Sequence, residues 1–213
     1  MARSAGRGTE GVTRNDCNLA PPVPMDSTDA TSAAFPCEQR LKDGQLLTLR
    51  EADGDDVDPL REYIDQIGHE TEFLSYLPGE FNPTHEEEAR YIERSRQQTD
   101  ALYLLALLGG RIVGILNFEP GTRRQFRHAG EFGMSVLQQH RGIGVGSALL
   151  DLFLEWARER RQITKLNLKV RADNQLAIAL YKSRGFTVEG VQTRSVLRNG
   201  RHHDALWMGI HVD

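Results

Sequence analysis

The sequence of 213 residues has little of several features that would mark particular classes of protein. Its two cysteines, Cys17 and Cys37, lie in an irregular N-terminal stretch without metal-ligand spacing, so we expect free thiols in the reducing cytoplasm and no metal site. No run of about 18 apolar residues is present that would span a membrane as a helix. Arg3, Arg7 and Arg14 are followed by no apolar block, so we expect no signal peptide.

An excess of basic residues is also missing. The formal net charge is -4 and the isoelectric point about 6.0, which gives no electrostatic footprint of a nucleic-acid binder. Hydrophobic residues make up 39% and charged residues 26% of the chain, as in an ordinary globular domain. We therefore expect neither a nucleic-acid partner nor a membrane partner, and a length that suits one domain with a full core.

The N-terminal part of the chain differs in composition from the rest. Residues 1–42 are rich in Gly, Ser, Thr, Ala, Asp and Pro and show no apolar period, which predicts a flexible leader. Met25 lies within this stretch and is an alternative start of the natural chain. Residues 43–213 then form the predicted folded domain.

Apolar periodicity in that domain changes repeatedly between two and 3.6 residues, which predicts the order β-α-α-β-β-β-α-β-α-β-β. Turn signals at Gly109-Gly110 and Asn199-Gly200 indicate two hairpins. The mixture of hairpins with one strand–helix–strand unit predicts an α+β fold with a mixed sheet. The expected strands cover residues 46–50, 102–108, 112–118, 129–137, 166–170, 186–197 and 203–210, and the expected helices begin near 55, 84, 145 and 175.

Three alternate glycines stand between a predicted strand and a predicted helix, in Arg141-Gly142-Ile143-Gly144-Val145-Gly146. Glycine allows positive φ and close backbone approach, and the helix N-terminus adds free N–H groups, so the turn suits a diphosphate. The alternative is a tight turn that holds no ligand. A Walker A loop needs a lysine that Gly146-Ser147-Ala148 lacks, and a Rossmann fingerprint needs G-x-G-x-x-G spacing in an early βαβ unit.

Two stretches resemble the motifs of the GNAT N-acetyltransferase family. Residues 136–150, Val-Leu-Gln-Gln-His-Arg-Gly-Ile-Gly-Val-Gly-Ser-Ala-Leu-Leu, are similar to motif A, with its core R/Q-x-x-G-x-G/A. Residues 168–186, with Asn174, Ala177, Leu180-Tyr181 and Gly185-Phe186, are similar to motif B, N-x-x-A-x-x-L-Y-x-x-x-G-F. The resemblance covers about residues 45–210. It implies the GNAT fold, with a mostly antiparallel central sheet that is splayed at the motif A strand and flanked by helices.

The resemblance also implies a ligand and a reaction, namely direct transfer of an acetyl group from acetyl-CoA to a primary amine in a ternary complex. The backbone of Met134, Ser135 and Val136 is expected to bind the pantetheine arm. Asn174 is expected to bond to the same cofactor. The pyrophosphate is expected to be wrapped by Arg141, Gly142, Ile143, Gly144, Val145, Gly146 and Ser147.

Two side chains are candidates for the proton transfers of this reaction. Tyr181 matches the family's usual general acid, which would protonate the leaving thiolate, and its alternative is a packed aromatic residue. Glu131 could act as the base, directly or through water, or bind a cationic substrate, and its alternative is a surface carboxylate. Alternation places Glu131 on one face of its strand and Met134, whose N–H is the candidate oxyanion donor, on the other.

The acceptor is less defined by the sequence than the donor. Some protein N-terminal acetyltransferases of the family carry a glutamate where this chain has Lys169, so we expect a small-molecule amine, such as an amino acid, a polyamine or a drug. Acetylation of a protein N-terminus or lysine is the alternative enzyme function, and a non-catalytic acyl-CoA sensor is the alternative of another class. Glu70, Glu72 and Tyr76 are candidates for acceptor contact. The resemblance also makes a homodimer an expectation.

Overall fold

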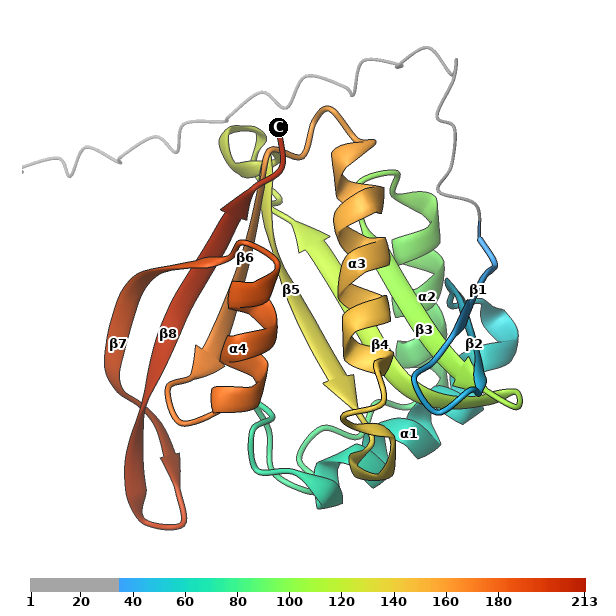
Figure 1. The fold of residues 1–213 in the computed structure, drawn as a ribbon, viewed down its shortest axis with the longest axis horizontal. Helices are drawn as coiled ribbons and strands as arrows, with labels where there is room; N and C mark the ends of the chain where they lie inside the picture. Colours follow the sequence, from blue (N-terminus) through green and yellow to red (C-terminus); the bar gives the residue numbers. More distant parts are fainter. Residues whose placement is uncertain (1–34) are drawn as a thin grey trace, which may run out of the picture. The chain divides into compact units, whose positions relative to one another are not determined.

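A computed structural model describes residues 35–213 (Figure 1), and residues 1–34, which include Cys17, Met25 and most of the predicted leader, lie outside that part. The described residues form one eight-stranded sheet in the order β1-β2-β3-β4-β5-β6-β8-β7. Only β5 and β6 pair in parallel, which confirms the predicted α+β class with a mostly antiparallel sheet. The strands are β1 (Cys37–Arg40), β2 (Leu46–Glu51), β3 (Leu102–Leu108), β4 (Arg111–Pro120), β5 (Ala129–Val136), β6 (Lys165–Arg171), β7 (Thr187–Arg198) and β8 (Arg201–His211).

Helices cover both faces of this sheet. They are α1 (Val57–Glu70), α2 (His85–Gln97), α3 (Val145–Arg158) and α4 (Gln175–Ser183). α3 and α4 lie on one face of the sheet, and α1 and α2 lie on the other (Figure 1). The first pair shares one apolar cluster with the sheet and the second pair shares another. Every residue of β3 is buried because its alternate side chains enter the two clusters in turn.

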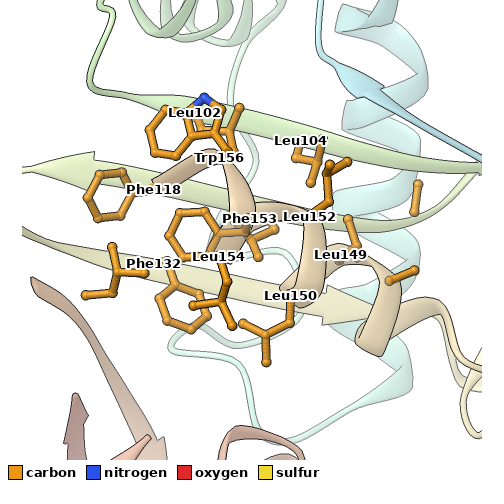
Figure 2. Packing of buried hydrophobic residues seen from close by; sticks show 14 of the residues in the cluster. Leu102, Leu104, Phe118, Phe132, Leu149, Leu150, Leu152, Phe153, Leu154 and Trp156 are labelled. Atoms are coloured by element: carbon orange, nitrogen blue, oxygen red, sulfur yellow. The ribbon is translucent and has the colours of Figure 1, made fainter. Parts of the chain in front are cut away.

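The larger cluster lies beneath α3. The apolar face of this helix places Phe153 against Phe118 of β4 and Phe132 of β5, and Trp156 against Phe118, with ring centroids between 5.0 and 5.8 Å apart (Figure 2). Phe153 and Trp156 are fully buried. This packing fixes α3 over β4 and β5, and therefore fixes where the helix N-terminus lies relative to the end of β5.

Local signals in the sequence set several boundaries. Thr84 and Glu87 form a capping box at the start of α2, because each side chain accepts a hydrogen bond from the other's backbone N–H. Gly109 and Gly110, with φ of 55° and 80°, form the tight turn between β3 and β4. Asn199 also adopts positive φ, at 51°, in the turn between β7 and β8.

The first strand lies inside the range that the sequence predicts to be leader. β1 pairs antiparallel with β2, and Leu41, which follows it, is 6% exposed. A strand of four residues with three exposed side chains carries too little apolar pattern to be visible in the sequence. Order in the described chain therefore extends to residues before the predicted boundary at residue 43.

Candidate active site

The sheet opens between β5 and β6. These two strands pair only at Ala129↔Lys165, Gly130↔Leu166 and Glu131↔Asn167, although both continue beyond this point. On its other side, β5 stays paired with β4 up to Val136. One edge of β5, from Phe132 to Val136, is therefore left without a neighbouring strand, as the predicted splay requires.

The open edge of β5 presents the backbone of alternate residues. The N–H of Leu137 donates to Val113 O in β4, at 3.0 Å, so Leu137 directs its backbone groups toward β4. Since backbone groups alternate in direction along a strand, those of Met134 and Val136 face the open edge. Arg141 Nε already donates to Val136 O, at 2.9 Å, and this leaves the groups of Met134 free for a ligand.

The glycine turn joins this edge to α3. Gly142 and Gly144 have φ of 80° and 116°, which only glycine adopts without strain. α3 has no side-chain cap and no acidic residue in its first turn. Within the described residues, the N–H groups of Val145, Gly146 and Ser147 have no acceptor, since the first helical bond is that of Ala148 N–H to Gly144 O. The turn is therefore an open site for an anion.

α4 closes the other side of the opening. A Cβ added to Gly146 would lie 3.4 Å from Leu180 Cδ2 and 3.8 Å from Met134 Cε, so α3, α4 and β5 converge at the splay. Asn174, a predicted cofactor contact, caps α4, because its side-chain oxygen accepts from Ala177 N–H at 3.3 Å. Its amide group remains available as a donor.

Tyr181 lies in α4 on the same face of the sheet as Phe132. Its ring packs edge-on against Phe132, with centroids 5.8 Å apart, and against Phe186 at 5.9 Å. Burial raises the pKa of its phenol to about 12, so the hydroxyl keeps its proton at neutral pH. That hydroxyl has no hydrogen-bond partner among the described residues, so the protein leaves its proton free for another acceptor.

Glu131 lies at the vertex of the splay, on the opposite face from Tyr181. The alternation predicted from the sequence is present: Phe132 points into the core beneath α3, while Glu131 is exposed. Its strand neighbours are Glu119 in β4 and Asn167 in β6. A base at Glu131 and an acid at Tyr181 can therefore serve one reaction only if the reacting centre lies in the gap between the strands.

The face that carries Glu131 is the one covered by α1 and α2. There the Tyr63 hydroxyl, from α1, lies 2.9 Å from Ser135 Oγ, and burial raises the Tyr63 pKa well above its ordinary value. Glu70, at the end of α1, accepts from Gln138 N–H at 2.7 Å. Tyr63 is missing from the predicted site because its helical spacing marks it only as a core residue of α1.

Arg171, at the end of β6, connects three segments at the mouth of the splay. Its guanidinium donates to both carboxylate oxygens of Asp173, at 3.0 and 2.6 Å, and to the backbone oxygen of Glu72 at 2.8 Å. It also lies 3.2 Å from His203 Nδ1 and 4.7 Å from the Phe73 ring centre. The side chain is 4% exposed. Arg171 thereby holds the loop between α1 and α2 against β6 and β8.

The other predicted acceptor contacts belong to this same loop. Glu72 Oε2 lies 3.3 Å from Arg171, and the backbone oxygen of Tyr76 accepts from Arg198 Nη1 at 3.4 Å. No group of three or more His, Cys, Asp or Glu side chains that could hold a metal ion occurs in residues 35–213. Within the same range, no helix has the length and apolar character needed to cross a membrane.

Comparison with known proteins gives consistent matches in sequence and fold. The sequence model of the protein family described as "Acetyltransferase (GNAT) family" matches residues 69–186, which contain the splay, the glycine turn and α4. The L-amino acid N-acetyltransferase AaaT of Escherichia coli (strain K12) is 32% identical over 124 residues, covering 58% of this chain and 76% of that protein.

Solved structures extend the match to most of the described chain. A GNAT-family acetyltransferase from Streptococcus pneumoniae superposes with a TM-score of 0.76 at 30% identity, covering 78% of this chain and 99% of the other. A GNAT-superfamily phosphinothricin acetyltransferase from Sinorhizobium meliloti, solved in complex with acetyl-CoA, has a TM-score of 0.66 at 22% identity and covers 78% and 88% of the two chains. This second likeness shows the shared fold alone.

Proposed function

Since the chain belongs to the GNAT family of acetyltransferases, we propose that it transfers the acetyl group of acetyl-CoA to a primary amine of a small molecule. The observation that supports this most directly is the opening between β5 and β6, with the free backbone edge of Met134 on one side and the uncapped start of α3 at its end. A long ligand with an extended arm and a diphosphate fits both features at once.

The proposed donor site uses two kinds of contact. The backbone C=O of Met134 accepts a hydrogen bond from an amide of the pantetheine arm, and Ser135 and Val136 shape the wall beside it. The N–H groups from Gly142 to Ser147 surround the pyrophosphate, where the positive end of the α3 dipole adds attraction. Arg141 contributes its positive charge while its Nε donates to Val136 O. The free amide group of Asn174 donates to the pantetheine arm.

The chemistry then needs three groups around the thioester. The amine attacks the carbonyl carbon, and the N–H of Met134 stabilises the oxyanion. As the C–S bond breaks, the Tyr181 hydroxyl donates its proton to the thiolate. Its raised pKa keeps the phenol fully protonated before the reaction. Glu131, on the acceptor side of the gap, takes the proton from the amine directly or through water.

The shape and charge of the acceptor side favour a small substrate. Arg171 draws the loop containing Glu72 and Phe73 against β6 and β8, which narrows the approach from that face. Lys169 shares the face of Glu131, two residues beyond Asn167 on β6, and is exposed. A negative and a positive side chain on one face suit a zwitterionic amino acid better than a polyamine. A protein N-terminus or lysine remains the second candidate.

Replacing Tyr181 tests the chemical role. We expect Tyr181→Phe to lower kcat by about 100-fold or more, because the phenol is the proton donor to the leaving thiolate. The KM for acetyl-CoA should stay within about twofold, because the ring and its packing against Phe132 are retained. Release of free thiol from acetyl-CoA, followed at saturating amine, measures both constants. An unchanged kcat would remove Tyr181 from the mechanism.

A panel of amines tests the acceptor class. Wild-type protein is assayed with amino acids, polyamines and peptides that have free N-termini, and we expect the highest kcat/KM with an amino acid. Lys169→Met should reduce that value and leave polyamine turnover unchanged, because only the carboxylate-bearing acceptor uses the lysine. Highest activity with peptides would favour the protein-directed alternative. Coenzyme A binding without turnover of any amine would indicate the acyl-CoA sensor.

A further inference from the structure

The short hairpin of β1 and β2 touches the glycine turn. The N–H of Lys42 donates to the backbone oxygen of Ile143 at 3.2 Å. The Leu41 side chain lies 3.6 Å from the place that a Cβ would take on Gly144, and it is buried in the same cluster as α3. Residues outside motifs A and B therefore contact the turn that is proposed to hold the pyrophosphate.

The hairpin turn is rigid enough to act as a support. Gly44 N–H donates to Leu41 O at 3.0 Å, and Leu41 N–H donates to Gln45 O at 2.9 Å. Asp43 accepts from both the backbone and the side chain of Gln45, which lowers the pKa of its carboxyl group. Lys42 is thus the second residue of a closed four-residue turn, and its position is set by the hairpin rather than by the glycine turn.

The bond to Ile143 O has a consequence for the next amide. In a trans peptide the C=O of one residue and the N–H of the next point in opposite directions. Holding Ile143 O toward Lys42 therefore directs the N–H of Gly144 away from the hairpin, where it has no acceptor among the described residues. Gly144, with φ of 116°, has no Cβ to restrict its side of this peptide, so the peptide can rotate when nothing holds it.

We propose that Lys42 and Leu41 are positioning residues of the coenzyme A site, which hold the Ile143–Gly144 peptide with its N–H directed at the pyrophosphate. This inference rests on the proposed function. It assigns to residues 37–44, part of which has the composition of a leader, a direct role in donor affinity. The backbone of Lys42 provides the support, and its side-chain charge does not.

A pair of variants at one position separates these two contributions. Proline is favoured at the second position of such a turn, so Lys42→Pro keeps the hairpin and removes only the N–H that donates to Ile143 O. Lys42→Ala is the matched control, which keeps the N–H and removes the charge. Both are made in the full chain, and thermal unfolding verifies that each variant folds.

Titration calorimetry with coenzyme A gives the main readout. We expect Lys42→Pro to raise the Kd about fivefold, the ratio that corresponds to one net hydrogen bond, and Lys42→Ala to leave it unchanged. The KM for acetyl-CoA should rise in parallel, with kcat and the KM for the amine unaffected. An unchanged Kd in Lys42→Pro, or an equal rise in both variants, would overturn the inference.

A second measurement does not depend on coenzyme A. NMR relaxation dispersion in the free protein should show microsecond-to-millisecond exchange at Gly144 in Lys42→Pro and none in Lys42→Ala. A rigid Gly144 in both variants would overturn the inference. If the wild type failed to bind coenzyme A, the proposed function would be contradicted, whereas the exchange at Gly144 would still report whether the hairpin supports the turn.

Discussion

Helices α2 and α3 have nearly the same length but begin in opposite ways. α2 starts with a complete capping box between Thr84 and Glu87, and Glu86 and Glu88 add two further acidic residues to its first turn. α3 starts after Gly144, with no side-chain cap and no acidic residue in the corresponding turn. The N–H groups that α2 satisfies internally are left open in α3.

The difference shows which helix start is satisfied within the chain and which, under the proposed function, is left open for the pyrophosphate. A free helix N-terminus has unsatisfied donors and a positive dipole end, which a local carboxylate ordinarily neutralises. Leaving these N–H donors without a partner lowers the stability of the folded protein, unless a bound ligand provides the negative charge. The equivalent positions of the two helices therefore give a direct test, because Ser147 of α3 stands where Glu87 stands in α2.

The largest effect, on the Kd for coenzyme A, is expected when the first turn of α3 is given the acidic residue that α2 has at the same position. Ser147→Glu should raise the Kd for coenzyme A by about 100-fold, because unit charges about 5 Å apart repel by roughly 3 kcal/mol at an effective dielectric constant of 20. Thermal stability of the free protein should stay equal or rise, since a carboxylate in the first turn is favourable by about 0.3–1 kcal/mol. Calorimetry and thermal unfolding measure the two effects.

Ser147→Gln is the control for the size of the new side chain. It should bind coenzyme A far better than Ser147→Glu, because it adds bulk without charge. Equal loss in the two variants would mean that space, and not the open dipole, determines affinity at this helix start.

A smaller effect, on stability and not on coenzyme A affinity, is expected in α2. Thr84→Ala removes the side chain that accepts from Glu87 N–H and should lower the free energy of unfolding by about 1 kcal/mol. The Kd for coenzyme A and kcat should not change, because this cap lies outside the splay. Urea unfolding and the thiol-release assay measure both. A marked loss of activity at full folding would show that the two helix starts are coupled.

The smallest expected effect depends on pH. The Thr84 N–H donates to the Glu87 carboxylate and lowers its pKa below the ordinary value of 4.5. A group with a lowered pKa in the folded state contributes stability above its unfolded pKa and loses that contribution as the pH falls through the folded value. Wild type should therefore be more stable than Glu87→Gln at pH 7.

This advantage of the wild type should shrink once the pH falls below about 4.5, the unfolded value. Urea unfolding of both proteins at pH 7, 5 and 3 checks the difference, and the other carboxylates cancel because both proteins share them. A stability difference that persisted unchanged at pH 3 would show that charge at this cap has no role.

Much of the site was open to sequence reasoning because its signals are local. The glycine spacing from Gly142 to Gly146 and the helix that follows are contiguous, and the alternation around Glu131 needs only the period of a strand. Tyr181 could be identified from motif B, whose Leu180-Tyr181 pair lies on the short helix α4. Its buried ring, and therefore its pKa of about 12, depends on Phe132 and Phe186 from other elements.

Other parts had no local signal. In the sequence, Arg171 is only one of the polar residues that alternate with apolar ones along a strand. Its hydrogen bond to Glu72 joins positions 99 residues apart. Tyr63 reads as a core residue of α1, although its hydroxyl meets Ser135 on the splayed strand. β1 is too short to show a period. Each of these features exists only because packing brings distant segments together.

The sequence by itself therefore determined the family, the order of helices and strands after β1 and the position of the glycine turn, since all of these follow from motifs, caps and periods within a few tens of residues. The tertiary structure alone decided where β5 and β6 separate, which backbone edge stays free and which loop Arg171 holds against β6 and β8. The physical reason is that strand pairing and side-chain burial depend on how the whole chain packs. The β1–β2 hairpin shows this most clearly, because its contact with Ile143 appears only once both segments are folded.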